Sequence, residues 1–189
     1  MTDATREPKI GLFFEVDPLP GHSDRYFDLA AALRPELAKN PGLIFIDRYK
    51  SIDRPNLVLS HSLWESEETL VAWRQHGQHR AIQKAGREQH FRDYRIRIGR
   101  VLAAGERTTP GRLACATYLD AEPRRHDGGE LFKSVYRDGK FLILSDTPRE
   151  AEAGAESRLF DVIRDYTMYD RTEAPQHYPP VERRVAGGA

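Results

Sequence analysis

The fold is decided by one stretch of the sequence, which reads Ser60-His61-Ser62-Leu63-Trp64-Glu65-Ser66-Glu67-Glu68-Thr69-Leu70-Val71-Ala72-Trp73-Arg74-Gln75-His76-Gly77-Gln78-His79-Arg80. It holds both tryptophans and three of the seven histidines of the chain. Its first part continues an alternating strand, Leu57 to Trp64, on which His61 shares one face with leucines. Its second part is a helix, with Ser66 as the expected N-cap and two glutamates in the first turn. The stretch is therefore a strand-to-helix junction.

Upstream of this junction the pattern predicts a strand, a helix and a second strand. Ile10 to Val16 is a short run of branched and aromatic residues, typical of a buried strand. Ser23 is a candidate N-cap for a helix whose apolar residues recur at helical spacing, namely Tyr26, Ala30, Leu33 and Leu37. Pro35 is expected to kink or restart this helix. The strand Leu43 to Ser51 then forms an antiparallel hairpin with Leu57 to Trp64.

Downstream of the junction, Gly77 is expected to bend the chain before a second helical piece from Gln78 to about His90. Tyr94, Ile96 and Ile98 alternate with arginines, which predicts a fourth strand, and Gly99 shifts that alternation, as a β-bulge would. The order β-α-β-β-α-β is the ferredoxin-like unit of the α+β class. Both faces of its sheet are apolar, so something must cover the face that the helices leave open.

The second half of the chain repeats the first in reduced form. Lys50-Ser51-Ile52 is echoed by Lys133-Ser134-Val135, and Arg92-Asp93-Tyr94 by Arg164-Asp165-Tyr166. We interpret the chain as a ferredoxin-fold domain (9–104), a smaller, mostly β degenerate repeat (112–171) and an extended tail (172–189). Chance similarity between two β-hairpins is the alternative. In the tail region, Tyr166, Met168 and Tyr169, followed by Ala174-Pro175-Gln176, are candidates to cover a partner subunit.

The composition narrows the possible functions. Of 189 residues, 31% are charged, and the formal net charge is zero, which argues against capture of nucleic acid. The single cysteine cannot form an internal disulfide. The polar N-terminus lacks the apolar segment of a signal peptide, and no apolar run approaches the roughly 20 residues that cross a bilayer. We expect a cytoplasmic protein without membrane contacts.

Several short motifs within residues 10 to about 101 carry a family resemblance. They include Ala72-Trp73-Arg74, His79-Arg80, Gly86-Arg87 and Asp93-Tyr94-Arg95-Ile96. On these motifs and the element order, this half of the chain resembles the antibiotic biosynthesis monooxygenase (ABM) domain. The resemblance implies a dimeric α+β barrel, in which two four-stranded sheets pack face to face and a pocket lies between each sheet and its helices. The second half could complete the barrel within one chain, but we expect a homodimer.

The resemblance also implies a function. Members include cofactor-free oxygenases of quinols and polycyclic phenols, and haem-degrading enzymes. We therefore expect a monooxygenase that uses dioxygen and no cofactor on a small phenol- or quinol-like substrate. The alternative is a non-catalytic barrel that binds a small molecule.

Histidine is the natural base near neutral pH, so His61 and His79 are the candidate catalytic residues. The candidate substrate-binding residues are Trp64, Trp73, Arg74, Arg87 and Tyr94, with a tryptophan stacking on a flat substrate and an arginine steadying an oxyanion. The competing interpretation is that Trp73 packs in the core and that His61 is a buried, hydrogen-bonded core histidine.

Two departures from the family pattern weaken particular reactions. The first strand, Gly11 to Val16, has no asparagine, whereas the polyketide-type and haem-degrading members carry one there. Gln83 stands where the haem-degrading members place their haem-ligating histidine. Haem binding is therefore weakly supported. His76 and His79 have no third ligand at an evident spacing, so we expect no metal site.

Overall fold

The computed structural model describes residues 7–124, 127–149 and 154–183. Its first half contains β1 (Ile10–Pro18), α1 (Ser23–Leu37), β2 (Leu43–Ser51), β3 (Val58–Trp64), α2 (Glu67–Gln75), α3 (Gly77–Ala85), the π-helical turn η1 (Gly86–His90) and β4 (Phe91–Val101). Its second half contains β5 (Leu113–Leu119), β6 (Glu130–Ser134), β7 (Phe141–Ser145) and β8 (Glu156–Thr167). The β-α-β-β-α-β order predicted for the first half is confirmed, with its second helix divided at His76, one residue before the predicted bend at Gly77.

The eight strands form one closed antiparallel barrel in the order β1-β3-β2-β6-β7-β5-β8-β4. The first half contributes β4-β1-β3-β2, and the second half contributes β8-β5-β7-β6. These two orders are the same once β5 to β8 are matched to β1 to β4. The two halves meet where equivalent strands pair, β2 with β6 and β4 with β8.

The pairing at both junctions follows the sequence echo. Lys50 lies directly opposite Lys133, its counterpart in the repeated Lys-Ser motif. At the other junction Arg95 lies opposite Thr167, which occupies the same position relative to the second Arg-Asp-Tyr motif. Equivalent residues of two antiparallel strands face one another when the strands are related by a twofold axis. The halves are thus arranged about an internal pseudo-twofold axis.

The chain covers the inner face of its first sheet by itself. Phe132, Leu142 and Phe160 from the second half pack in one buried cluster with Phe13 and Leu59 from the first. The expectation that a second subunit covers this face is therefore wrong, because β5 to β8 close the barrel within one chain. Homodimer formation stays a prediction, and covering this face no longer requires it.

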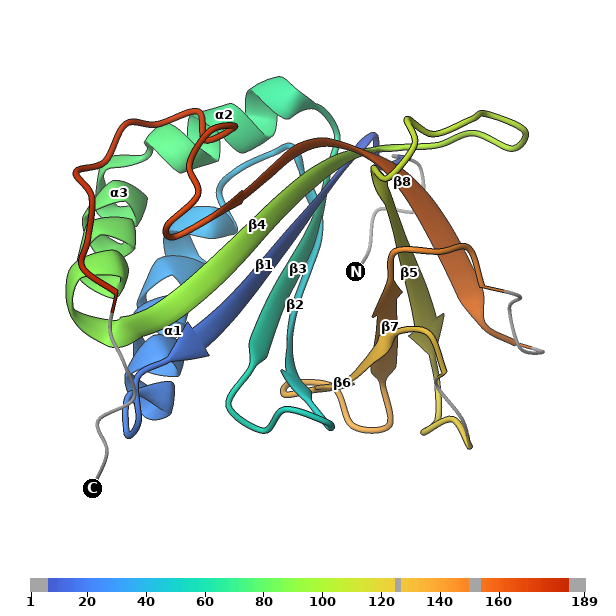
Figure 1. Cartoon of the computed structure of the whole chain (residues 1–189), viewed down its shortest axis with the longest axis horizontal. Coiled ribbons are helices and arrows are strands. Elements are labelled where there is room, and N and C mark those ends of the chain that lie inside the picture. The colour runs from blue at the N-terminus through green and yellow to red at the C-terminus, as the bar shows by residue number, and fades with distance from the viewer. Residues whose placement is uncertain (1–6, 125–126, 150–153, 184–189) are drawn as a thin grey trace.

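The helices lie outside the barrel against β1 to β4, and the described part of the second half has no helix (Figure 1). The predicted apolar face of α1 is confirmed, since Tyr26, Ala30, Leu33 and Leu37 are all buried. Leu33 and Leu37 join the two tryptophans, Trp64 and Trp73, in a second buried cluster. The molecule thus has two apolar layers, the barrel interior and the space between sheet and helices.

Local details agree with the predictions from the sequence except within α1, at its N-cap and at Pro35. Ser66 caps α2 by accepting a hydrogen bond from the Thr69 N–H, and the β4–β8 register shifts between Ile98 and Gly99. Ser23, however, is the first helical residue; His22 occupies the N-cap without a capping side-chain bond. The Nδ1 atom of His22 lies instead 3.0 Å from Nδ1 of His90. The helix α1 runs through Pro35 undivided and ends two residues later.

The tail returns over the chain's own helices (Figure 1). Here the tail means residues 168–183, which form no helix or strand; of the extended arm predicted for 172–189, residues 184–189 lie outside the described ranges. Arg87 donates a hydrogen bond of 2.9 Å to the Pro179 carbonyl, and the Tyr178 hydroxyl lies 3.3 Å from Gln83 Oε1. This segment packs on the chain that carries it, and its coverage of a partner subunit stays a prediction.

Candidate functional site

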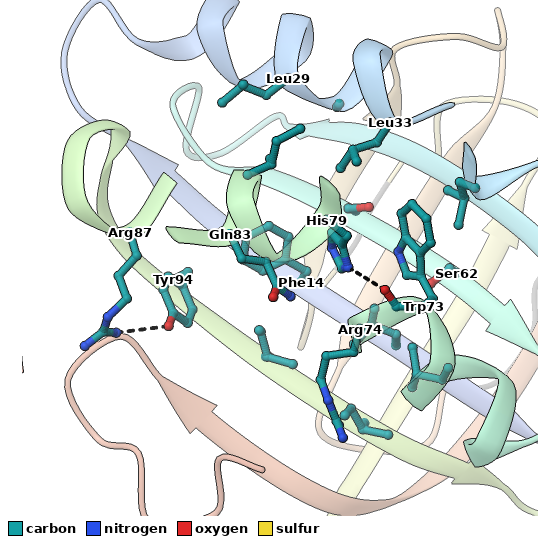
Figure 2. A pocket seen from close by; sticks show the side chains of 18 of the residues that line it. Phe14, Leu29, Leu33, Ser62, Trp73, Arg74, His79, Gln83, Arg87 and Tyr94 are labelled. Carbon is teal, nitrogen blue, oxygen red and sulfur yellow. Dashed lines mark hydrogen bonds between the residues drawn. The ribbon is translucent and has the colours of Figure 1, made fainter. Parts of the chain in front are cut away.

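A cavity of about 160 Å³ lies between the outer face of β1 to β4 and the three helices. Side chains from these strands, these helices and the tail enclose it (Figure 2). Most of the lining is aliphatic or aromatic, and no aspartate or glutamate of the described ranges contributes to it. An apolar cavity with a few polar groups is the usual form of a small-molecule site.

The strands line the cavity with alternate residues. On β3 these are Ser60, Ser62 and Trp64, because successive side chains point to opposite faces of a strand. Trp64 donates its indole N–H to the Ser62 hydroxyl at 2.9 Å, which holds the ring against the cavity wall. β1 contributes Leu12 and Phe14 on the same principle.

His79 packs directly on Trp73. Their rings are stacked, with centroids 4.6 Å apart and planes 16° apart. The Nδ1 atom of His79 lies 3.0 Å from the Trp73 carbonyl (Figure 2). That carbonyl belongs to the last turn of α2 and also accepts a hydrogen bond from the His76 N–H at 3.1 Å. The bend at His76 between α2 and α3 brings the imidazole back to it.

This contact sets the chemistry of His79. A carbonyl can only accept, so Nδ1 carries the proton and Nε2 keeps its lone pair. Burial lowers the pKa of His79 to about 4, although the Trp73 carbonyl acts in the opposite direction. His79 is therefore a neutral imidazole near pH 7. It can accept a proton from a bound molecule.

Four arginines line the cavity, from β2, α2, η1 and the tail: Arg48, Arg74, Arg87 and Arg171. In the described structure, the buried Nε atoms of Arg48, Arg74 and Arg171 have no hydrogen-bond partner. Buried donors are normally paired, so these groups are available to an anionic ligand. The Arg48 side chain also lies near Tyr26, whose phenol pKa is raised by burial against the opposing influence of Arg48 and Ser60.

Arg87 makes three bonds with the chain itself. Its Nη1 atom donates to the Tyr94 hydroxyl at 3.1 Å and to the Met168 carbonyl at 2.8 Å, and its Nη2 atom donates to the Pro179 carbonyl. Its guanidinium also lies 5.7 Å from the ring centre of Tyr178. Arg87 therefore attaches the tail to the helical layer.

Six of the seven predicted site residues line the cavity, namely Trp64, Trp73, Arg74, His79, Arg87 and Tyr94. His61 does not. Its side chain points to the other face of β3, into the barrel interior, where it is fully buried. It stacks on Phe13 at 4.4 Å, donates from Nδ1 to the Leu12 carbonyl, and accepts at Nε2 from the Tyr118 hydroxyl at 2.6 Å. The structure thus favours the interpretation of His61 as a hydrogen-bonded core histidine.

Several residues that line the cavity were not predicted from the sequence. Arg48 and Ser60 could have been found from strand alternation, because each shares a face with a residue that lines the cavity. Arg171, Gln176 and Tyr178 belong to the tail, which has no periodic pattern to place it. Tertiary contacts place the tail at the cavity, among them those of Arg87 with Pro179, Gln83 with Tyr178 and Tyr94 with Arg171.

The described ranges have neither a metal-binding cluster nor a membrane-spanning helix. They contain no group of three or more histidine, cysteine, aspartate or glutamate side chains placed to hold a metal ion. None of their helices is long and apolar enough to cross a bilayer. Gln83, at the position of the family's haem ligand, lines the cavity with an amide.

The closed barrel and its sheet–helix cavity place this chain among the α+β barrel proteins. Residues 10–85 match the family described as antibiotic biosynthesis monooxygenase. The jasmonate monooxygenase ABM of Pyricularia oryzae is 32% identical over 212 residues, which cover 90% of this chain and 99% of that protein. The chain belongs to the antibiotic biosynthesis monooxygenase family.

More distant likenesses were also found. An uncharacterized Bacillus subtilis protein, YqjZ, is 27% identical over 64 residues, covering 34% of this chain and 54% of that protein. A solved Pseudomonas aeruginosa structure, PA3566, covers 53% of this chain and 100% of its own at 14% identity, with a TM-score of 0.46. The solved structure of an anthrone oxidase-like protein covers 90% of this chain and 98% of its own at 12% identity, with a TM-score of 0.42.

Proposed function

We propose that this protein is a monooxygenase that oxidises a small, largely apolar molecule in the sheet–helix cavity without a bound cofactor. The observation that carries the proposal is the neutral imidazole of His79, held on Trp73 at the wall of an apolar cavity. A base in a dry site can turn a phenol into an electron-rich anion. Trp73 offers a flat apolar surface for an aromatic ring.

For a phenol- or quinol-like substrate the reaction balances without a further reductant. His79 Nε2 takes the hydroxyl proton, and the resulting anion forms a carbon–oxygen bond with dioxygen. The protonated His79 returns its proton to the resulting peroxide, the ring carbon then loses its hydrogen as a proton, and the O–O bond breaks with release of water. One oxygen atom remains as a new carbonyl and the other leaves in water. The substrate itself thus supplies the two electrons that reduce the second oxygen atom to water.

The name of the Pyricularia oryzae relative suggests a second kind of substrate, an apolar body with one carboxylate. The arginines of the cavity, without any acidic neighbour in the lining, are compatible with such an anion. Hydroxylation of an unactivated C–H group takes two electrons that this substrate does not supply. That reaction needs an added reductant such as a reduced nicotinamide or flavin.

Oxygen uptake distinguishes these substrates. Quinols and naphthols are assayed alone, and jasmonate is assayed with and without reduced nicotinamide or flavin. The proposal expects one dioxygen consumed per product, with one atom of ¹⁸O₂ in the product. It also expects the His79→Gln variant to be much slower and the His76→Gln variant to match the wild type. No product in any arm, with a folded protein, would contradict it.

A non-catalytic binding protein is the second candidate. The cavity positions of the first strand are Leu12 and Phe14, and the family's asparagine is absent from this strand. This candidate predicts that the same compounds bind and quench tryptophan fluorescence while no oxygen is consumed.

A further inference from the structure

Tyr94 lies on β4 at the cavity wall and is 8% exposed. Its hydroxyl receives two hydrogen bonds from guanidinium groups, from Arg87 Nη1 at 3.1 Å and from Arg171 Nη1 at 2.7 Å. Arg87 comes from the helical layer and Arg171 from the tail. Two cationic side chains that are distant in the sequence therefore converge on one phenol oxygen.

These contacts determine what the hydroxyl can still do. A guanidinium has donors and no acceptor, so Tyr94 must be the acceptor in both bonds. Its oxygen lone pairs are then occupied, and only its own proton remains to be donated. In the described ranges no acceptor for that proton is recorded, although buried hydroxyls are normally paired. Two adjacent cations also polarise the O–H bond and make it a stronger donor.

We propose that Tyr94 donates its hydroxyl proton in a hydrogen bond to an anionic oxygen of the molecule bound in the cavity. Arg87 and Arg171 are positioning residues that orient and polarise this hydroxyl. The proposal rests on the proposed function only in that a small molecule occupies this cavity. The ligand class is an apolar body with one oxyanion, either a phenolate or a carboxylate.

The charge around Tyr94 supports an anion. Arg74 also lines the cavity and has an unpaired, buried Nε atom. Tyr166, on the neighbouring strand, has its pKa raised to about 12 by burial and by Tyr94, while Arg171 and Arg74 oppose that rise. Both arginines therefore act on the same side of the cavity. With no carboxylate in the described lining, their charge is left for a ligand to balance.

Binding under anaerobic conditions tests this inference independently of turnover. Three ligands share one ring and differ in one group: 4-nitrophenolate, 4-nitrobenzoate and the neutral 4-nitrotoluene. Their dissociation constants are measured by tryptophan quenching and by the absorbance of bound nitrophenolate. Wild-type protein should prefer at least one anion over the neutral compound, and which anion it prefers separates the phenolate from the carboxylate.

The Tyr94→Phe variant removes one oxygen atom and keeps the ring. Arg87 retains the carbonyls of Met168 and Pro179, and Arg171 retains that of Gln176, so the tail should stay in place. We expect about tenfold weaker binding of the preferred anion and unchanged binding of 4-nitrotoluene, as for loss of one charge-assisted bond. Tyr49→Phe is the matched control, because its hydroxyl also accepts from an arginine, Arg137, but lies in the barrel core and outside the cavity lining.

Arg171→Met should also weaken binding of the preferred anion, and Arg171→Lys should retain part of the affinity that Arg171→Met loses. The pKa of bound 4-nitrophenol gives a readout that a purely structural role would not move, and it should rise in Tyr94→Phe and in Arg171→Met. Equal anion affinity in wild type and a folded Tyr94→Phe variant would overturn the inference. So would failure of the wild type to bind either anion. If Tyr94→Phe does not fold, the two Arg171 variants decide. If Tyr94→Phe loses the anion preference but the wild-type protein consumes no oxygen with any substrate, the inference about Tyr94 stands and only the proposed function is refuted.

Discussion

The imidazole of His79 stacks on the indole of Trp73 and donates to the backbone carbonyl of the same residue, at 3.0 Å. One residue thus sets the position and the tautomer of the candidate base. The arrangement depends on the bend at His76, because a continuous helix would not return the His79 ring to that carbonyl.

Replacement of His79 by glutamine should lower turnover by about 10²- to 10⁴-fold, the usual contribution of a positioned base. Because the pKa of His79 is about 4, wild-type activity should persist to about pH 5 and decline as the pH falls through 4. Steady-state oxygen uptake measures the turnover of the variant and the pH dependence of the wild type. His76→Gln is the control, since His76 stacks on Trp73 at 5.4 Å but does not line the cavity. Equal turnover in wild type and His79→Gln would exclude His79 as the base.

His61 should make stability depend on pH. Burial lowers its pKa to about 4 from the ordinary 6.5, so the unfolded chain binds the proton more readily. The stabilisation is complete above pH 6.5 and is lost as the pH falls from 6.5 towards 4. Between pH 7 and pH 5 the loss is about 2 kcal/mol for this one residue.

Urea unfolding at several pH values measures that loss, and His79, with a similarly lowered pKa, adds to it with the same sign. In the His61→Gln variant the free energy of unfolding should depend less on pH, because the contribution of His61 is lost and only that of His79 remains. A His61→Gln variant with the wild-type slope would show that His61 does not titrate in this way.

Gly11 makes room for an aromatic ring of the barrel core. A β-carbon at Gly11 would lie 2.4 Å from Cε1 of Phe160. The Gly11→Ala variant should therefore lower the free energy of unfolding by about 1–3 kcal/mol through overpacking. Gly77→Ala is the matched control, because a β-carbon there meets nothing within 4 Å.

Adding Phe160→Leu to Gly11→Ala should recover part of the loss that Gly11→Ala causes, because the smaller side chain removes the clash. A double-mutant cycle from chemical denaturation gives the coupling. Strictly additive effects would mean that the ring is not the obstacle.

Arg87 should control release of the tail. Replacing it with methionine removes the bonds of 2.8 Å to the Met168 carbonyl and 2.9 Å to the Pro179 carbonyl. Local opening then becomes easier, and trypsin cleavage after Arg171 should accelerate by about tenfold or more. Mass spectrometry of timed digests follows the cleavage. Arg80→Met, at an exposed position of α3, should digest like the wild type, and an unchanged rate in Arg87→Met would refute the role.

Strand alternation correctly grouped the residues of β3 and left one question open. Leu59, His61 and Leu63 share a face, as expected, and Ser60, Ser62 and Trp64 share the other. All seven residues of β3 are buried. A period of two separates the faces of a strand but does not say which one meets the helices when both are covered. His61 and Trp64 were both predicted to line the site although they lie on opposite faces of β3. Only the structure shows that the Trp64 face meets the helices and the His61 face meets the barrel interior.

The sequence by itself determined the local elements and the repeat, because hydrophobic period, caps and turns act over a few residues. It also placed Trp73 on one helix and His79 on a second helical piece that follows a bend at Gly77. Only the tertiary structure decided that β2 meets β6 and β4 meets β8 within one chain, and that Arg171 reaches Tyr94. Those contacts join residues about 77 apart, and no local pattern records a pairing that forms only when the barrel closes.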